Sequence, residues 1–271
     1  MLKFVDLFCG GGFGARGAVK AGATPILAVD AWQLAASKET AIGIIPWIET
    51  MKPRWLIVEN VNRMKKWGRH QELVSAIESY GYTVNDLLLN SADFGVPQAR
   101  KRMFLVCDLQ GSVITQEDLV ALRPKSINSA RSIIDWSGVY KSRPLYREKR
   151  AQATIDRAER AIEALGRGKD FIIVYYGSDY AGGWQSLDAP LRTVTTIDRF
   201  GLVTWENDTP YLRMLQPPEL LKAMGTGSKH LLSHGSRRDK VKLCGNGVCS
   251  PVMEMIFKKI TLIEDSEVGL A

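Results

Sequence analysis

The stretch Lys3–Gly17, which reads KFVDLFCGGGFGARG, constrains the fold of this 271-residue chain most strongly. A short apolar run ends at Phe8, glycines occupy Gly10 to Gly12, and a helical pattern begins near Ala15. A strand, a glycine-rich turn and a helix N-terminus bring backbone N–H groups together around a ligand. Glycine is favoured there because a Cβ would block both the turn and the close approach of the ligand.

A second short strand is predicted at Thr24–Val29, and Asp30 follows it directly. Nucleotide-binding α/β folds place a carboxylate for the ribose hydroxyls about twenty residues beyond the glycines. The position of Asp30 therefore favours an adenosine-type ligand, although glycine turns between strand and helix also occur for structural reasons alone. A triphosphate P-loop is not indicated, because no Lys-Ser or Lys-Thr pair closes the turn.

The composition is that of an ordinary soluble globular protein, with 45% hydrophobic and 24% charged residues. No apolar run approaches the roughly 20 residues that span a bilayer, and no signal peptide is indicated, so we expect a cytoplasmic protein. Four scattered cysteines do not form a disulfide scaffold. Neither the cysteines nor the histidines have the spacing of a metal site, so none is expected.

Basic residues are concentrated in two stretches of a chain whose net charge is +7. Such stretches suit a phosphate backbone as partner, or they form a solvated basic face; charge alone does not decide between these readings. The first stretch contains Arg123, Lys125, Arg131, Lys141, Arg143, Arg147, Lys149 and Arg150, and the second contains Arg237, Arg238, Lys240 and Lys242.

Strand and helix patterns alternate in the first 107 residues, which favours an α/β fold with a doubly wound, mainly parallel sheet. After Asp108 a charged helix and antiparallel strands are expected instead, the strands at Phe171–Tyr176 and Leu191–Thr196. We therefore expect a large domain of residues 1–107 and 244–264, and a smaller domain of residues 108–243. The tail from Glu264 is expected to fray.

Five short motifs occur along the chain in a characteristic order. They are Asp6-Leu7-Phe8 with its glycines, Glu59-Asn60-Val61, Gln98-Ala99-Arg100-Lys101-Arg102, Arg192-Thr193-Val194 and Gly245-Asn246-Gly247-Val248. Together they resemble the DNA (cytosine-5) methyltransferases over nearly the whole chain. The resemblance implies a Rossmann-like methyltransferase domain with a smaller target-recognition domain, S-adenosylmethionine as cofactor and duplex DNA as partner.

The resemblance also implies roles for individual residues. Phe8 would stack on the adenine, Asp30 would bind the ribose, and other residues would surround the rest of the cofactor. Glu59 would face a flipped cytosine and hydrogen-bond or protonate its N3, which requires a carboxyl held partly protonated in a dry pocket. Arg102 would bind the base's O2, and Arg100 would support that loop. The full cofactor set is Asp6, Phe8, Gly10, Gly12, Asp30, Asn246 and Val248.

The chain departs from the family pattern in two places. Phe13-Gly14 inverts the usual order of glycine and apolar residue, which puts the local backbone of the loop in question. More importantly, the family's nucleophile is the cysteine of a Pro-Cys dipeptide, and this chain contains no Pro-Cys. Only one helix and one strand fit between Asp30 and Glu59, so about fifty residues are missing, judged by the size of βα units.

Three explanations of the missing segment remain open. It lies in the protein but not in these 271 residues, it comes from a second polypeptide, or the chain is an inactive relative. The first is favoured because Ser37-Lys38-Glu39 resembles an abrupt join within a helix. The expected function is methyl transfer to C5 of cytosine in duplex DNA by a monomer, or with a complementing chain. The alternatives are tRNA cytosine methylation and a non-catalytic subunit; the recognition sequence cannot be read from the chain.

Overall fold

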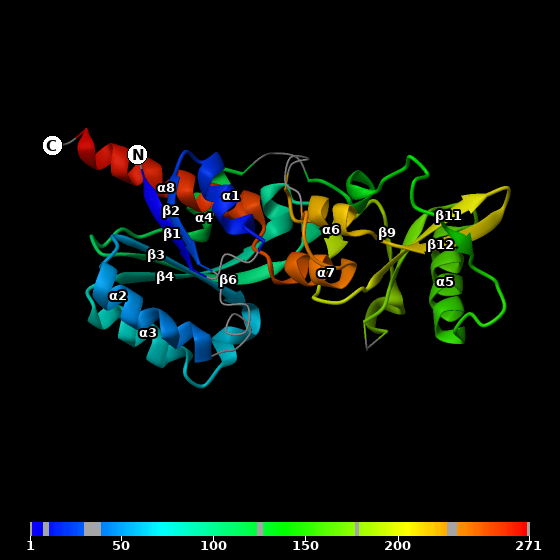
Figure 1. Ribbon diagram of the computed structural model, residues 1–271, viewed down its shortest axis with the longest axis horizontal. Helices are drawn as coiled ribbons and strands as arrows, with labels where there is room; N and C mark the ends of the chain where they lie inside the picture. The colour runs from blue at the N-terminus through cyan, green and yellow to red at the C-terminus, as the bar shows by residue number, and fades with distance from the viewer. Residues whose placement is uncertain are drawn as a thin grey trace. The chain divides into compact units, whose positions relative to one another are not determined.

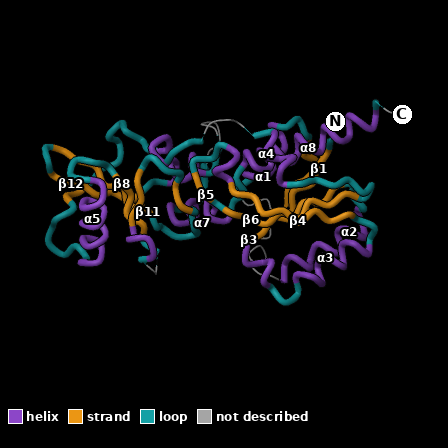
Figure 2. The backbone as a smooth tube through the Cα atoms, turned by 180° about the vertical axis from the view of Figure 1, so that it is seen from behind, coloured by secondary structure: helices purple, strands orange, loops and turns teal. Residues whose placement is uncertain are grey.

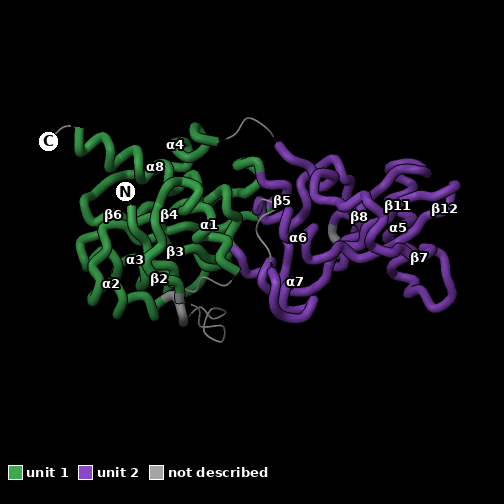
Figure 3. The backbone as a smooth tube through the Cα atoms, turned by 45° about the horizontal axis from the view of Figure 1, so that its top comes forward, with its two compact units in different colours: residues 1–95, 100–125, 248–271 green, residues 96–99, 126–247 purple. Residues whose placement is uncertain are grey.

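The computed structural model describes residues 2–7, 11–29, 39–123, 127–176, 179–226 and 232–269. The chain forms two compact units (Figure 3): unit 1 is Met1–Gly95, Arg100–Lys125 and Val248–Ala271, and unit 2 is Val96–Ala99 and Ser126–Gly247. The sequence predicts a boundary near residue 108, whereas unit 1 continues through helix α4 (Gln116–Ala121). Helix α4 belongs to unit 1 because Leu119 is buried and Asp118 forms an ion pair with Lys259 at 2.9 Å.

Unit 1 contains two separate sheets. Strands β1 (Lys3–Leu7) and β2 (Thr24–Val29) form a parallel pair. Strands β3 (Trp55–Val61), β6 (Lys101–Asp108) and β4 (Thr83–Asn90) form an antiparallel sheet in the order β3-β6-β4. The prediction of one mainly parallel sheet is therefore wrong for the described strands. β4 and β6 are antiparallel because only a short connection joins them, and a parallel pair would need a long crossover.

Helices cover both faces of the β3-β6-β4 sheet (Figures 1 and 2). On one face, α2 (Ile45–Met51) and α3 (His70–Ser79) lie together. Their buried residues Ile48, Leu73 and Ile77 pack with alternate residues of β6 in one apolar cluster. The other face is covered by α1 (Phe13–Lys20), α4 and α8 (Ser250–Val268).

Helix α8 continues to Val268, so the prediction of a frayed tail from Glu264 is wrong for the described residues. Two contacts with β3 and its preceding residue hold the last turns. The indole N–H of Trp55 donates to Glu264 at 3.1 Å, and Arg54 forms an ion pair with Glu267 at 2.7 Å. Among the described residues, no helix combines the length and apolar character needed to cross a bilayer.

Unit 2 is built on a five-stranded sheet in the order β7-β12-β11-β8-β9. Helix α5 (Gln152–Leu165) packs against this sheet through Ala158 and Ala161, which lie in a cluster with Phe171 and Val203. The strands are β7 (Arg143–Pro144), β8 (Phe171–Val174), β9 (Trp184–Ser186), β11 (Phe200–Glu206) and β12 (Thr209–Met214).

The strand predicted at Leu191–Thr196 is shorter and pairs differently than expected. Only Leu191–Arg192 (β10) is a strand, and it pairs in parallel with β5 (Gln98–Ala99). The pairing of β10 with β5 ends at Arg192, and the buried Gln98 side chain then binds the next part of the chain. Its amide oxygen accepts from the Val194 N–H at 2.8 Å, where a longer strand would use a backbone carbonyl, and its amide nitrogen donates to the Ala223 carbonyl at 2.9 Å.

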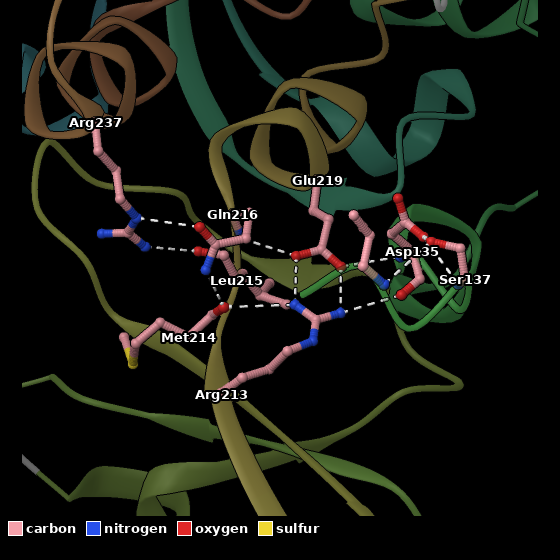
Figure 4. Close-up of polar contacts among 9 residues, drawn as sticks. Asp135, Ser137, Arg213, Met214, Leu215, Gln216, Glu219 and Arg237 are labelled. Carbon is pink, nitrogen blue, oxygen red and sulfur yellow. Dashed lines mark hydrogen bonds and ion pairs between the residues drawn. The ribbon is translucent and has the colours of Figure 1, made fainter. Parts of the chain in front are cut away.

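A buried ion pair holds the end of β12 to helix α6 (Pro217–Ala223) in unit 2 (Figure 4). Arg213 and Glu219 are 2.7 Å apart, and Glu219 is fully buried. The Glu219 carboxylate also accepts from the backbone N–H groups of Asp135 at 2.9 Å and Gln216 at 2.8 Å. Four N–H groups thus donate to the buried carboxylate, two from the Arg213 guanidinium and two from the backbone. Such hydrogen bonds compensate the loss of hydration, which is the condition under which a buried ion pair is tolerated.

Replacing Glu219 with Ala should destabilise the protein by about 3–5 kcal/mol, because the buried Arg213 then lacks a charged partner. The matched control in the same unit is Asp208→Asn, which breaks the exposed Arg167–Asp208 pair and should cost less than about 1 kcal/mol. Urea unfolding followed by circular dichroism measures both values. If both variants lost the same free energy of unfolding, the buried pair would contribute no more to stability than the exposed pair.

Candidate active site

The glycine-rich turn of unit 1 has the geometry that the sequence predicts, as far as it is described. Asp6 lies in β1, and Gly12 is the N-cap residue of α1 with φ of 69°. This left-handed conformation favours glycine, and no side chain caps the helix. No heavy atom lies within 4 Å of a Cβ built on Gly12, so the turn is open on that side among the described residues. The predicted cofactor residues Phe8, Gly10 and Asp30 lie outside the described residues.

Asn246 and Val248 flank the boundary of the two units. Asn246 is the exposed last residue of α7 (Arg237–Asn246) in unit 2, and Val248 opens the last segment of unit 1. Gly245 packs tightly within unit 2: an added Cβ would lie 2.3 Å from the Thr195 carbonyl carbon. The Gly245 motif therefore contacts the residues that directly follow the Arg192 motif, although the two motifs are distant in sequence.

Glu59 and Arg102 form the central pair of unit 1. Glu59 is opposite Phe104 in the β3–β6 ladder, so Arg102, two residues away, is its diagonal neighbour on the same face. The Arg102 Nε lies 3.2 Å from Glu59 Oε1, and the two side chains are only 16% and 18% exposed. Glu59 Oε1 itself is buried and makes no hydrogen bond to any described residue.

Burial shifts the pKa values of this pair in opposite directions. It raises the pKa of Glu59, while the positive charges of Arg100 and Arg102 oppose that rise. Burial lowers the pKa of Arg102 to about 10. The positive charge of Arg100 lowers this pKa further, and the negative charge of Glu59 opposes the fall. Desolvation thus outweighs the mutual attraction at both groups. Glu59 and Arg102 are therefore not an exposed surface pair, and Glu59 keeps a proton to higher pH than an ordinary carboxyl.

Cys249 is a member of this cluster that the sequence motifs did not reveal. Its buried thiol hydrogen-bonds with Ser91 and lies in the electrostatic field of Arg100, Arg102 and Glu59. Ser91 Oγ also accepts from the Arg100 N–H at 3.2 Å. Burial raises the pKa of the Cys249 thiol, so it is a poor nucleophile at neutral pH. Only the proximity of Cys249 to Asn246 in sequence could have suggested its place.

The basic stretches are only partly available to a partner. Arg237 is bound to Asp198 and donates to the Leu215 carbonyl at 2.9 Å (Figure 4), so it stabilises unit 2 itself. Lys125 lies outside the described residues, and Arg123 belongs to unit 1. Within the described ranges, no group of acidic, His and Cys residues could hold a metal ion. In the first stretch, the basic residues of unit 2 on its surface are Arg131, Lys141, Arg143, Arg147, Lys149 and, half-buried, Arg150; in the second stretch, Arg238 is exposed and Lys240 and Lys242 are half-buried.

The titration of Glu59 provides a direct test of this site. We expect its carboxyl to titrate above 4.5, and Arg102→Gln to raise that pKa further, because the guanidinium favours the carboxylate. Glu72 is the matched control: its exposed hydrogen bonds to Arg69 lower its pKa. ¹³C NMR of labelled glutamate, with Glu59→Gln for assignment, measures all of these. A Glu59 that titrates below 4.5, or moves down in Arg102→Gln, would contradict the described environment.

The chain is similar in sequence to known methyltransferases. Residues 40–262 match the family model of the C-5 cytosine-specific DNA methylases. The type II methyltransferase M.HgiDI of Herpetosiphon aurantiacus is 27% identical over 149 residues, which cover 53% of this chain and 47% of the relative. The orphan methyltransferase M.SssI of Spiroplasma monobiae is 23% identical over 216 residues, covering 77% and 53%. The chain thus spans about half the length of these curated relatives.

A solved structure supports the fold. The Dnmt2 methyltransferase of S. pombe superposes with a TM-score of 0.63 at 11% identity, covering 98% of both chains. At this identity the likeness concerns the fold alone, which is that of the methyltransferases. The family model covers residues 40–262, which is well over half of the chain. The chain therefore belongs to the C-5 cytosine-specific DNA methylase family.

Proposed function

We propose that this chain is the cofactor- and base-binding part of a DNA (cytosine-5-)-methyltransferase. The observation that carries the proposal is the buried Glu59–Arg102 pair, since burial favours a protonated carboxyl beside a guanidinium. The reaction would transfer a methyl group from S-adenosylmethionine to C5 of a cytosine flipped out of duplex DNA. The restriction-modification setting of its type II relatives is the natural context.

Glu59 and Arg102 suit the polar edge of cytosine. A protonated Glu59 carboxyl donates a hydrogen bond to the ring N3, and Arg102 donates to the O2. A proton shared with N3 draws electron density from C6 and makes that carbon more open to attack. Arg100 lies two residues before Arg102 in the sequence, and its backbone N–H donates a hydrogen bond to Ser91. Arg100 would therefore be a positioning residue.

The glycine turn fits S-adenosylmethionine, which supplies the methyl group when bound. The uncapped N-terminus of α1 offers backbone N–H groups, and the open side of Gly12 admits a ligand close to the backbone. Asp6 lies in the preceding strand. Phe8, Gly10 and Asp30 keep the roles that the resemblance implies, and Asn246 and Val248 complete the proposed cofactor set.

None of the described cysteines supplies the thiolate that the covalent step needs. In the family's reaction a thiolate adds to C6, C5 takes the methyl group, the C5 proton is removed and the thiolate then leaves. Cys107 is buried in the β6 core and burial raises its pKa to about 12, while Cys244 is buried in unit 2. Cys249 is near the pair but held as a thiol. We therefore propose that the nucleophile comes from a segment outside these 271 residues.

Unit 2 would be the target-recognition domain, which the sequence predicts at residues 108–243. Its surface arginines and lysines suit a phosphate backbone. The tRNA alternative is weaker, because the matching family model is one of DNA methylases. A non-catalytic DNA-binding subunit remains the non-enzymatic rival, and it would not need a protonated Glu59.

The proposal predicts a preference for a mispaired cytosine. Duplex DNA with one mispaired cytosine should bind more tightly than the same duplex with a mispaired thymine, because Glu59 and Arg102 select the cytosine edge. Glu59→Ala should abolish about 1–3 kcal/mol of this discrimination. Fluorescence anisotropy at fixed salt measures it, and Glu72→Ala is the control that should keep the preference.

Two results would contradict the proposed function. If the native protein binds both duplexes equally, the Glu59 site does not select cytosine and the subunit alternative is favoured. If transfer RNA binds more tightly than any duplex and Glu59→Ala weakens that binding, the tRNA alternative replaces DNA.

A further inference from the structure

Ser91 lies opposite Arg100 at the position that follows the last pair of the β4–β6 ladder, Asn90 with Lys101. The Ser91 N–H donates to the Arg100 carbonyl at 3.0 Å, as in an antiparallel ladder. The return bond is different, because the Arg100 N–H donates to the hydroxyl oxygen of Ser91 at 3.2 Å. The Ser91 side chain therefore takes the place that a backbone carbonyl has in a regular ladder.

This arrangement lets the chain leave the sheet while Arg100 stays bound. Ser91 begins the 3₁₀ turn η3 (Ser91–Phe94), and its carbonyl accepts from the Gly95 N–H at the end of that turn. The carbonyl of Ser91 thus serves the turn, and its hydroxyl serves Arg100. Both residues are buried, so water does not readily replace a hydrogen bond that is lost between them.

The Cys249 thiol contacts the same hydroxyl from another part of unit 1. Cys249 is the buried N-cap residue of α8, and its thiol hydrogen-bonds with the Ser91 hydroxyl. Its place is fixed by the packing of α8 on α1. The next residue, Ser250, donates to the Phe13 carbonyl at 2.8 Å, and a Cβ on Gly17 would lie 2.3 Å from the Ser250 carbonyl oxygen. The Ser91 hydroxyl is thus held between α8 and the residue that precedes β6.

Arg100 carries the effect of these contacts to the Glu59–Arg102 pair. Its positive charge lowers the pKa values of Glu59, Arg102 and Cys249, so its guanidinium lies within electrostatic reach of all three groups. Arg100 directly precedes β6, and Arg102 is the second residue of that strand. A displacement of Arg100 would therefore move Arg102 relative to Glu59 and change the electrostatic field at the Glu59 carboxyl.

We propose that Ser91 is a positioning residue of the base site, and that Cys249 orients its hydroxyl. Ser91 binds the backbone N–H and C=O of Arg100, and Arg100 then sets the place of Arg102 beside Glu59. This inference rests on the proposed function, because the site that Ser91 positions is the one proposed to bind cytosine.

Removing the hydroxyl in Ser91→Ala tests this role. We expect the preference for a mispaired cytosine over a mispaired thymine to fall roughly fivefold or more, which is the factor that one neutral hydrogen bond contributes. The pKa of Glu59 should rise, because the Arg100 guanidinium that lowers it is displaced. Fluorescence anisotropy and ¹³C NMR of labelled glutamate measure these two effects.

The matched control is Thr226→Val in unit 2. Thr226 is also buried, and its hydroxyl donates to the Leu221 carbonyl at 2.7 Å, so this variant loses a comparable hydrogen bond. Thr226→Val should destabilise the protein in urea unfolding but change neither the cytosine preference nor the pKa of Glu59. The two readouts thus separate a positioning role from a purely structural one.

Cys249 provides a second pair of variants, whose result does not depend on whether Ser91→Ala folds. Cys249→Ala removes the partner that orients the Ser91 hydroxyl, so it should lower the cytosine preference by about twofold or more. Cys249→Ser keeps a hydrogen-bonding group at the same place and should retain most of the preference.

Three results would overturn the inference. They are a cytosine preference that Ser91→Ala leaves intact, a pKa of Glu59 that stays or falls in that variant, and equal preferences in Cys249→Ala and Cys249→Ser. If the native protein shows no cytosine preference but the pKa of Glu59 rises in Ser91→Ala, the proposed function fails and the positioning of Glu59 stands. If the native protein prefers cytosine and Ser91→Ala changes neither readout, the positioning role alone fails.

Discussion

Strand β6 is the constraint on which unit 1 depends, because its register with β3 places the two charged residues of the site. Pairing of Glu59 with Phe104 and of Val61 with Arg102 puts Glu59 and Arg102 on the same face. A slip of one residue would turn one of them to the opposite face, toward the core of α2 and α3. Seven residue pairs with β3 and eight with β4 fix that register. The relative position of these two side chains therefore depends on the hydrogen-bond ladders of β6.

Some features of unit 1 could be predicted from the sequence and others could not. The strand–turn–helix around Gly12 followed from the residues themselves, whereas a common site for Glu59 and Arg102 was implied only by the resemblance to the family. Sheet topology did not follow, because alternating patterns are the same for parallel and antiparallel neighbours. Cys249 was missed because its contact with Ser91 joins residues far apart in the chain, and no local pattern records such a contact.

The missing segment has a structural counterpart. The sequence showed too few residues between Asp30 and Glu59, and the structure divides the strands of unit 1 into two sheets there. Apolar residues remain exposed beside the division, at a cost in free energy of roughly 25 cal/mol per Å² of uncovered apolar surface. The described chain keeps the glycine turn and the Glu59–Arg102 pair, and burial raises the pKa of Cys249, the described thiol beside that pair.

We propose that these residues can hold a cytosine but cannot attack it. Duplex DNA with 5-fluorocytosine tests it most directly, because fluorine cannot be eliminated from C5 and a thiolate adduct would persist. With protein confirmed by mass to have these 271 residues, we predict reversible binding and no band that survives denaturing electrophoresis. A covalent band would contradict the account. If Cys249→Ser or Cys9→Ser then abolished that band, the responsible cysteine would be the nucleophile that the chain was thought to lack.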